Sequence, residues 1–169
     1  MQDDTIQVCY ALHDREGARM RHMGASIASL LANTERKVRV HLIHDALLSP
    51  GDREKFRELV EEKHRQALVL HSMEGAELPE RYRELLADRA APGKYPREAA
   101  YLLFTPELLQ DEPKVILLDA DMLFHLDIRF LWEEDAGRHG IAAVPETANP
   151  GAAGYTQRRQ LVASGEVRA

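Results

Sequence analysis

The segment Asp119-Ala120-Asp121 most constrains what this chain can fold into, because it ends the almost entirely apolar run at residues 114–118. Such a run is typical of a strand buried in a parallel sheet. Two carboxylates about 5 Å apart repel each other by roughly 3 kcal/mol at an effective dielectric constant near 20. A divalent cation offsets this repulsion, and Mg²⁺ and Mn²⁺ prefer carboxylate oxygens. Because residues i and i+2 of an extended segment point to the same side, the pair predicts a metal site at a strand end.

An alternative interpretation is that both aspartates are solvated loop residues that simply end the strand. The residues after the pair, Met122-Leu123-Phe124, are again apolar. Acidic side chains inside an apolar run are costly unless they are ligated or hydrogen-bonded. This context favours the metal site.

The spacing of apolar residues predicts an α/β fold with a mainly parallel sheet. It predicts strands at residues 6–12, 38–44, 67–71, 114–118 and 140–144. It predicts helices at residues 19–31, 50–65 (capped by Ser49), 77–90 and 97–109 (interrupted near Pro106), with a short helical turn at 130–132 that packs on the core. This order indicates a doubly wound, Rossmann-like sheet with helices on both faces. Ligands bind at the carboxyl edge of such a sheet, where we expect the loop at residues 13–17 and the Asp119-Asp121 segment to lie.

Composition excludes several classes of protein. The chain has 169 residues and a formal charge of −6, which argues against a general nucleic-acid binder. No apolar stretch approaches the ~20 residues of a membrane span, and the polar N-terminus does not look like a signal peptide. The single cysteine, Cys9, rules out a disulfide framework, so we expect a cytoplasmic protein. Its apolar neighbours make Cys9 a poor nucleophile.

No glycine-rich motif follows the first strand and no Walker lysine is present, so a dinucleotide dehydrogenase or P-loop enzyme is not expected.

Several segments together resemble the family 8 glycosyltransferases, which are retaining enzymes of the GT-A fold that use nucleotide-sugar donors. The most specific match is residues 114–121, with Leu131-Trp132 and residues 142–145 downstream. Supporting matches are residues 8–12, 24–31 and 104–109, and a weaker one is residues 40–45. The resemblance covers about residues 6–146.

The resemblance implies a metal-dependent, retaining transfer of a hexose from a UDP-sugar, such as UDP-glucose or UDP-galactose, to a saccharide or similar acceptor. Asp119 and Asp121 fall on the family's Asp-x-Asp motif, which implies that they bind Mn²⁺ or Mg²⁺ on the donor diphosphate. The cation neutralises charge on the departing nucleoside diphosphate. The resemblance identifies no catalytic residue in this chain.

The resemblance also implies donor contacts. Ala120 falls where the family's backbone lies against the ribose, and Ala11 falls where the family holds the uracil base. Two positions after that alanine the family usually has an acidic residue. Here that position is His13, or Asp14 if the loop is longer. Both residues are therefore candidates for contact with the base.

Two departures from the family pattern affect these expectations. Leu102 occupies a position where the family often carries an arginine, so a contact with the donor phosphates is either missing or supplied by Lys94 or Arg97. Those two cations are otherwise solvated loop residues. The family's acceptor-side half, with its C-terminal His and Lys, does not follow. We therefore expect a nucleotide-sugar-binding domain at residues 1–146 and a tail at 147–169 that starts the missing half, in a chain that is either a fragment or naturally short.

Three further expectations remain open. The missing half leaves a non-catalytic nucleotide-sugar-binding or interaction module as the alternative function. Phosphotransferases of the haloacid dehalogenase type also place Asp-x-Asp after a strand, but their motif continues Gly-Thr near the N-terminus, whereas Met122-Leu123 follows here. An exposed apolar edge would also favour self-association, so we expect a homodimer.

Overall fold

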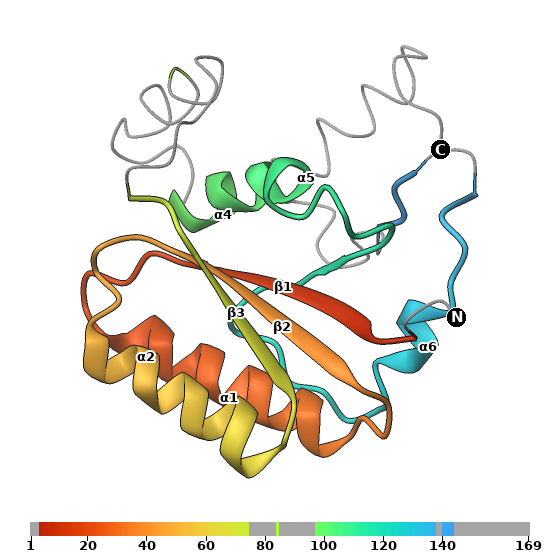
Figure 1. Cartoon of the computed structure of the whole chain (residues 1–169), viewed down its shortest axis with the longest axis horizontal. Coiled ribbons are helices and arrows are strands. Elements are labelled where there is room, and N and C mark those ends of the chain that lie inside the picture. The colour runs from red at the N-terminus through yellow and green to blue at the C-terminus, as the bar shows by residue number, and fades with distance from the viewer. Residues whose placement is uncertain (1–3, 75–83, 85–96, 138–139, 144–169) are drawn as a thin grey trace, which may run out of the picture. The chain divides into compact units, whose positions relative to one another are not determined.

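Four parallel strands form a single sheet in the described part of the computed structural model, which covers residues 4–74, 84, 97–137 and 140–143. The sheet order is β3-β2-β1-β4, as Figure 1 shows. The strands are β1 (Ile6–Leu12), β2 (Val38–His44), β3 (Ala67–Ser72) and β4 (Ile116–Leu117). Every pair is parallel, and β1 and β2 pair along their whole length, from Ile6 opposite Val38 to Leu12 opposite His44. The predicted α/β, Rossmann-like fold class is confirmed.

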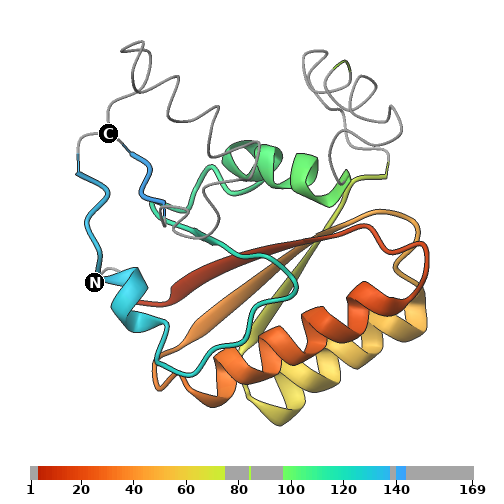
Figure 2. The same cartoon turned by 180° about the vertical axis from the view of Figure 1, so that it is seen from behind.

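Helices cover both faces of the sheet (Figures 1 and 2). On one face lie α1 (Ala18–Ala32) and α2 (Pro50–Arg57), the latter continuing as the π-helical turn η1 (Glu58–Lys63). On the other face lie α4 (Arg97–Tyr101), the 3-10 turn η2 (Leu102–Phe104) and α5 (Thr105–Leu108). A further short helix, α6 (Arg129–Trp132), follows β4 at the position of the predicted helical turn; its Trp132 packs against the core, whereas Phe130 and Leu131 are exposed.

Two apolar clusters hold these layers together. The larger cluster joins α1, α2 and η1 to one face of the sheet through side chains that include Tyr10, Ile27, Leu42, Phe56 and Val60. The smaller cluster joins the other face to α4, η2 and the end of α5 through Cys9, Ala11, Ile43, Tyr101, Phe104 and Leu109. All seven residues of β1 are buried because this strand lies inside the sheet with helices on both of its faces.

Local sequence explains how the helices begin and end. The Ser49 hydroxyl accepts a hydrogen bond from the Asp52 amide at 3.2 Å, and Pro50 takes the first helical position of α2, as predicted. The predicted interruption between residues 97 and 109 is the 3-10 turn η2, after which Pro106 stands in the first turn of α5. The predicted helix at residues 77–90 lies outside the described residues, apart from residue 84.

Two strand predictions are corrected. The strand before Asp119 comprises only Ile116 and Leu117, and Leu117 is 50% exposed rather than buried, because β4 is an edge strand of the described sheet. Residues 140–143 form no strand, and Ile141 is 81% exposed. Gly140 has a φ of 71°, a left-handed conformation that interrupts an extended segment. Val144, the last residue of that predicted strand, lies outside the described residues.

The chain divides into two compact units, Met1–Glu134 and Asp135–Ala169. The first unit contains all the helices and strands named above. The predicted boundary after residue 146 falls within the second unit, outside the described residues, and stays a prediction. None of the described helices is both long and apolar enough to cross a membrane.

Candidate functional site

The carboxyl ends of β1 and β4 lie side by side in the sheet. β1 pairs with β2 on one side and with β4 on the other, so the sheet order reverses between β1 and β4. The Leu118 amide donates to the Cys9 carbonyl at 3.0 Å, which extends the pairing beyond β4. In an open α/β sheet, this switch point is where ligands bind. The loop after Leu12 and the segment Asp119-Ala120-Asp121 therefore meet at one edge, as the sequence predicted.

Burial alternates along the segment that carries the two aspartates. Ile116 and Leu118 are buried, and Ala120 is partly buried against the larger apolar cluster. Asp119 and Asp121 are exposed. Both carboxylates are thus open to solvent just beyond β4, where Ala120 and Asp121 form a turn.

The chemistry of this pair fits a hard divalent cation. Two carboxylates supply oxygen ligands, and Mg²⁺-type sites commonly use one or two protein carboxylates together with water and substrate phosphates. Within the part of the chain that the structure describes, no group of three or more His, Cys, Asp or Glu side chains could hold a metal ion. Among the described residues, Asp119 and Asp121 are the pair that the sequence predicted for such a site, and no third side chain of these types joins them.

The loop after β1 is organised by Asp14. Its Oδ1 accepts hydrogen bonds from the amides of Glu16 (3.2 Å) and Gly17 (2.8 Å), and its Oδ2 accepts one from the Met20 amide at 2.8 Å. Gly17, at φ 74°, turns the chain into α1. Both carboxylate oxygens of Asp14 are thus engaged by backbone donors at the start of α1.

His13 belongs to a cluster that sequence reasoning missed. Its Nδ1 lies 2.5 Å from Oδ2 of Asp45, and the Tyr101 hydroxyl donates to the same oxygen at 2.9 Å. The Leu47 amide donates to the other oxygen, Oδ1, at 3.1 Å. Burial raises the pKa of Asp45, but the hydrogen bonds from His13, Leu47 and Tyr101 outweigh it, so the pKa lies below its ordinary value. The sequence contained one signal for the His13–Asp45 contact: Asp45 directly follows the second strand, as His13 follows the first.

The structure describes only some of the residues that the sequence predicted at the donor phosphates. Leu102, at the family's arginine position, is partly buried and packs against the smaller apolar cluster. Arg97 begins α4, but its side chain and the whole of Lys94 lie outside the described residues. An ion pair joins Arg19 of α1 to Glu98 of α4. Ala11 is buried near the end of β1.

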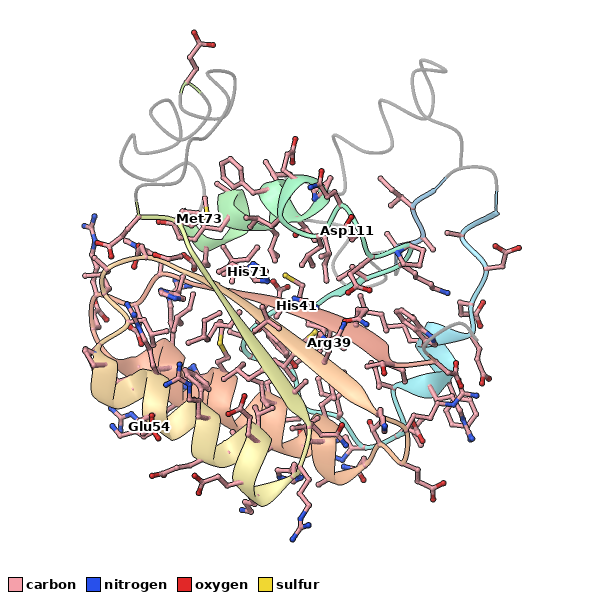
Figure 3. All side chains as sticks on the ribbon, in the orientation of Figure 1. Arg39, His41, Glu54, His71, Met73 and Asp111 are labelled. Carbon is pink, nitrogen blue, oxygen red and sulfur yellow. The ribbon has the colours of Figure 1, made fainter. Side chains whose placement is uncertain are left out.

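A second titratable cluster lies on the sheet face that carries α4 and α5 (Figure 3). The rings of His41 and His71 stack with centroids 5.2 Å apart, and His41 Nδ1 lies 3.0 Å from His71 Nε2. His41 Nε2 lies 2.9 Å from Oε1 of Gln7. Burial, together with the charges of His71 and Arg39, lowers the pKa of His41 to about 4.

Cys9 is not a nucleophile in this fold. Burial raises the pKa of its thiol to about 11, and the hydrogen bond with Thr105 only partly opposes that rise. A thiol with this pKa is protonated at neutral pH. The structure agrees with the prediction for Cys9.

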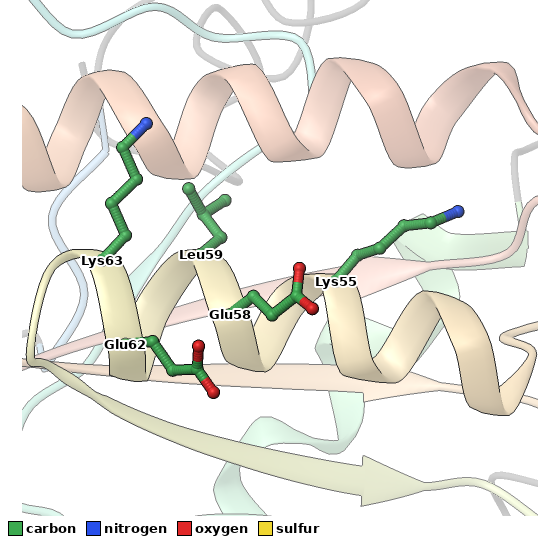
Figure 4. A pocket seen from close by; sticks show the side chains of 5 residues that line it. All are labelled: Lys55, Glu58, Leu59, Glu62 and Lys63. Atoms are coloured by element: carbon green, nitrogen blue, oxygen red, sulfur yellow. The ribbon is translucent and has the colours of Figure 1, made fainter.

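A hollow on the helical layer does not suit a ligand. It is lined by Lys55, Glu58, Leu59, Glu62 and Lys63 of α2 and η1 (Figure 4). The lining is one helix face with charges of both signs, which is typical of a solvated surface. Among the described residues, the sheet topology favours the carboxyl edge at β1 and β4 as the candidate site.

Comparisons with known proteins indicate the family and the fold of the chain. The model of the family "Glycosyl transferase family 8" matches residues 10–165. No curated protein matches the chain. Among solved structures, that of mouse xyloside xylosyltransferase 1 in its apo form is similar at 15% sequence identity and a TM-score of 0.45. The match covers 76% of this chain and 47% of that protein, so this chain spans about half its length.

Proposed function

We propose that this chain, which belongs to glycosyl transferase family 8, binds the diphosphate of a UDP-sugar through a divalent cation held by Asp119 and Asp121. One observation carries the proposal: both carboxylates lie on the solvent side of a segment that ends at the switch point of a parallel sheet. Bound there, Mn²⁺ or Mg²⁺ would supply Lewis-acid stabilisation of the departing nucleoside diphosphate. The reaction proposed is retaining transfer of a hexose to a saccharide or similar acceptor.

The residues around the pair would hold the rest of the donor. The partly buried side chain of Ala120 turns inward against the apolar cluster, which leaves its backbone for the ribose. Ala11, at the end of β1, and the His13-Asp14 loop are proposed to hold the base. Lys94 and Arg97 are proposed to contact the phosphates, since Leu102 offers no charge there.

Calorimetric titration with UDP, with and without Mn²⁺, tests this proposal. We expect binding that needs the metal and weakens roughly 10- to 100-fold in Asp119→Asn and in Asp121→Asn, because each removes a charged ligand. Asp111→Asn is the matched control, since it neutralises an exposed aspartate outside the site, and it should bind UDP as the unaltered chain does. Equal affinity for UDP in all four proteins, or UDP binding that does not depend on Mn²⁺, would overturn the metal site.

A non-catalytic nucleotide-sugar-binding module is the second candidate function. Two observations favour it: only two potential metal ligands meet at the site among the described residues, and an apolar leucine, Leu102, stands at the family's arginine position. Release of free sugar or a transfer product from a UDP-sugar distinguishes the two functions. Turnover that disappears in Asp121→Asn shows a catalyst, whereas metal-dependent UDP binding without turnover shows a binding module.

We also propose that the chain forms a homodimer. The segment after the aspartate pair exposes large apolar side chains: Leu123 is 63%, Leu126 73% and Phe130 57% exposed. Apolar side chains gathered on one exposed segment favour association.

A further inference from the structure

The chain turns at the aspartate pair and then runs back beside α1. Ala120 and Asp121 form the turn, and residues 122–128 follow it as a return segment without regular secondary structure. Figure 2 shows this return segment passing along α1 toward α6. Ile128 is buried in the larger apolar cluster, and Ala120 and Phe124 pack against it. The return segment is thus joined to the same apolar cluster as α1.

Two side chains of α1 and its C-terminal cap hold the backbone of Phe124. The Phe124 amide donates a hydrogen bond to Oγ of Ser29 at 3.1 Å, and Nδ2 of Asn33 donates to the Phe124 carbonyl at 3.0 Å. Nδ2 of Asn33 also donates to the Ser29 carbonyl at 2.8 Å. Residues four apart lie on one face of a helix. The Ser29–Asn33 pair therefore satisfies both backbone groups of Phe124, as a neighbouring strand would.

The turn is thereby anchored on both of its sides. On the incoming side, the Leu118 amide donates to the Cys9 carbonyl of β1 at 3.0 Å. On the outgoing side, Phe124 is held by the Ser29–Asn33 pair of α1. Among the described residues, Leu118 and Phe124 are the nearest positions on either side of the aspartates that hydrogen-bond to another element. Residues 119–123 thus span the gap between an anchor on the sheet and an anchor on a helix.

We infer that Ser29 and Asn33 are positioning residues for the divalent cation proposed at Asp119 and Asp121. The inference rests on the proposed function. Two ionised carboxylates repel each other, so a turn anchored on one side only would let them move apart. A turn anchored on both sides keeps them within reach of one cation, and binding then costs less conformational entropy. Ser29 and Asn33 act through the backbone of Phe124 and not as ligands.

The first test is the affinity for Mn²⁺ in the presence of UDP, measured from the electron paramagnetic resonance signal of the free ion. We expect Ser29→Ala and Asn33→Ala each to weaken Mn²⁺ binding roughly 3- to 10-fold, about one hydrogen bond. Ser29→Thr keeps the hydroxyl and should bind Mn²⁺ nearly as the unaltered chain does. The matched control is Thr34→Val, which removes a 2.7 Å hydrogen bond from the Thr34 hydroxyl to the Leu30 carbonyl at the same end of α1.

Urea unfolding without metal separates positioning from a merely structural role. Ser29→Ala and Thr34→Val each remove a hydrogen bond, so both should unfold at a lower urea concentration than the unaltered chain. Only the variants of the Ser29–Asn33 pair should also lose Mn²⁺ affinity. An equal loss of Mn²⁺ affinity in Thr34→Val would overturn the inference, because the effect would then follow stability alone.

The second test is hydrogen exchange of the Phe124 amide in the unaltered chain, followed by NMR with Mg²⁺ in place of the paramagnetic Mn²⁺. Coupling between two sites is reciprocal, so a contact that favours the bound cation must itself be favoured by it. Saturating Mg²⁺ and UDP should therefore slow exchange at Phe124 by a similar factor of roughly 3 to 10. If the variants do not fold, this measurement decides, and an unchanged exchange rate at Phe124 would overturn the inference.

The outcomes separate the inference from the proposed function. Mn²⁺ binding that requires Asp119 and Asp121 but is equally tight in Ser29→Ala, Asn33→Ala and the unaltered chain would overturn the inference alone. An unaltered chain that binds no Mn²⁺ in the presence of UDP would overturn the proposed function, and the inference with it.

Discussion

Acid should destabilise this protein through His41, because the fold holds that side chain neutral. The amide of Gln7 donates to the Thr5 carbonyl at 3.3 Å, so its Oε1 faces His41 and accepts from Nε2. Nδ1 of His41 is then the acceptor for Nε2–H of His71. A proton added to Nδ1 of His41 would place two donors against each other in a site where His41 is only 3% exposed.

The size of the effect follows from the pKa of His41. The value is about 4 in the folded protein against 6.5 for an ordinary histidine, so between these values the unfolded chain binds the proton more readily. The stabilisation of the fold by unprotonated His41 is present above pH ~6.5 and is lost as the pH falls toward ~4. Between about pH 7.5 and pH 5 this one group should lower the free energy of unfolding by roughly 2 kcal/mol. Burial and His44 lower the pKa of His71 as well, which adds in the same direction.

Urea unfolding at the two pH values, followed by circular dichroism, measures this contribution. In His41→Gln the titrating group is gone while an amide remains to donate to Gln7, so we expect about 2 kcal/mol less loss on acidification than in the unaltered chain. His125→Gln, which replaces an exposed histidine, should lose as much as the unaltered chain. Identical losses in His41→Gln and the unaltered chain would refute the argument.

Three other predictions concern single features of the fold. The Cys9 thiol, with a pKa of about 11, should stay unreactive toward Ellman's reagent in the native protein and react on unfolding; rapid native reaction would contradict its burial. Ser49→Ala should lower the free energy of unfolding by about 1 kcal/mol because α2 loses its cap, and an unchanged urea midpoint would contradict this. Replacing Leu126 and Phe130 together by lysine should convert a dimer into a monomer in analytical ultracentrifugation. A monomer at high concentration in the unaltered chain would exclude the dimer.

The sequence predicted those parts of the fold that depend on local patterns. The bounds of β1 and β2 follow from apolar runs, and the start of α2 follows from Ser49 and Pro50. The placement of the Asp119-Asp121 segment just after a strand follows from the apolar run before it. Each of these signals lies within a few neighbouring residues.

The parts that the sequence did not predict depend on contacts between distant segments. The length of β4 depends on whether a neighbour covers its outer side, which residues 114–118 alone do not reveal. The bond between His13 and Asp45 joins residues 32 positions apart and requires the register of two strands. Tyr101 joins them only because α4 packs over the same edge, which no spacing in the sequence indicates.

The most direct test of the central claim, that the strand-end aspartates hold a divalent cation on a nucleoside diphosphate, is an electron paramagnetic resonance titration of Mn²⁺. In the presence of UDP, the account predicts that the unaltered chain removes free Mn²⁺ signal in proportion to one bound ion, and that Asp119→Ala and Asp121→Ala each abolish most of this loss. An equal loss of free Mn²⁺ signal in the unaltered chain and in both variants would contradict it.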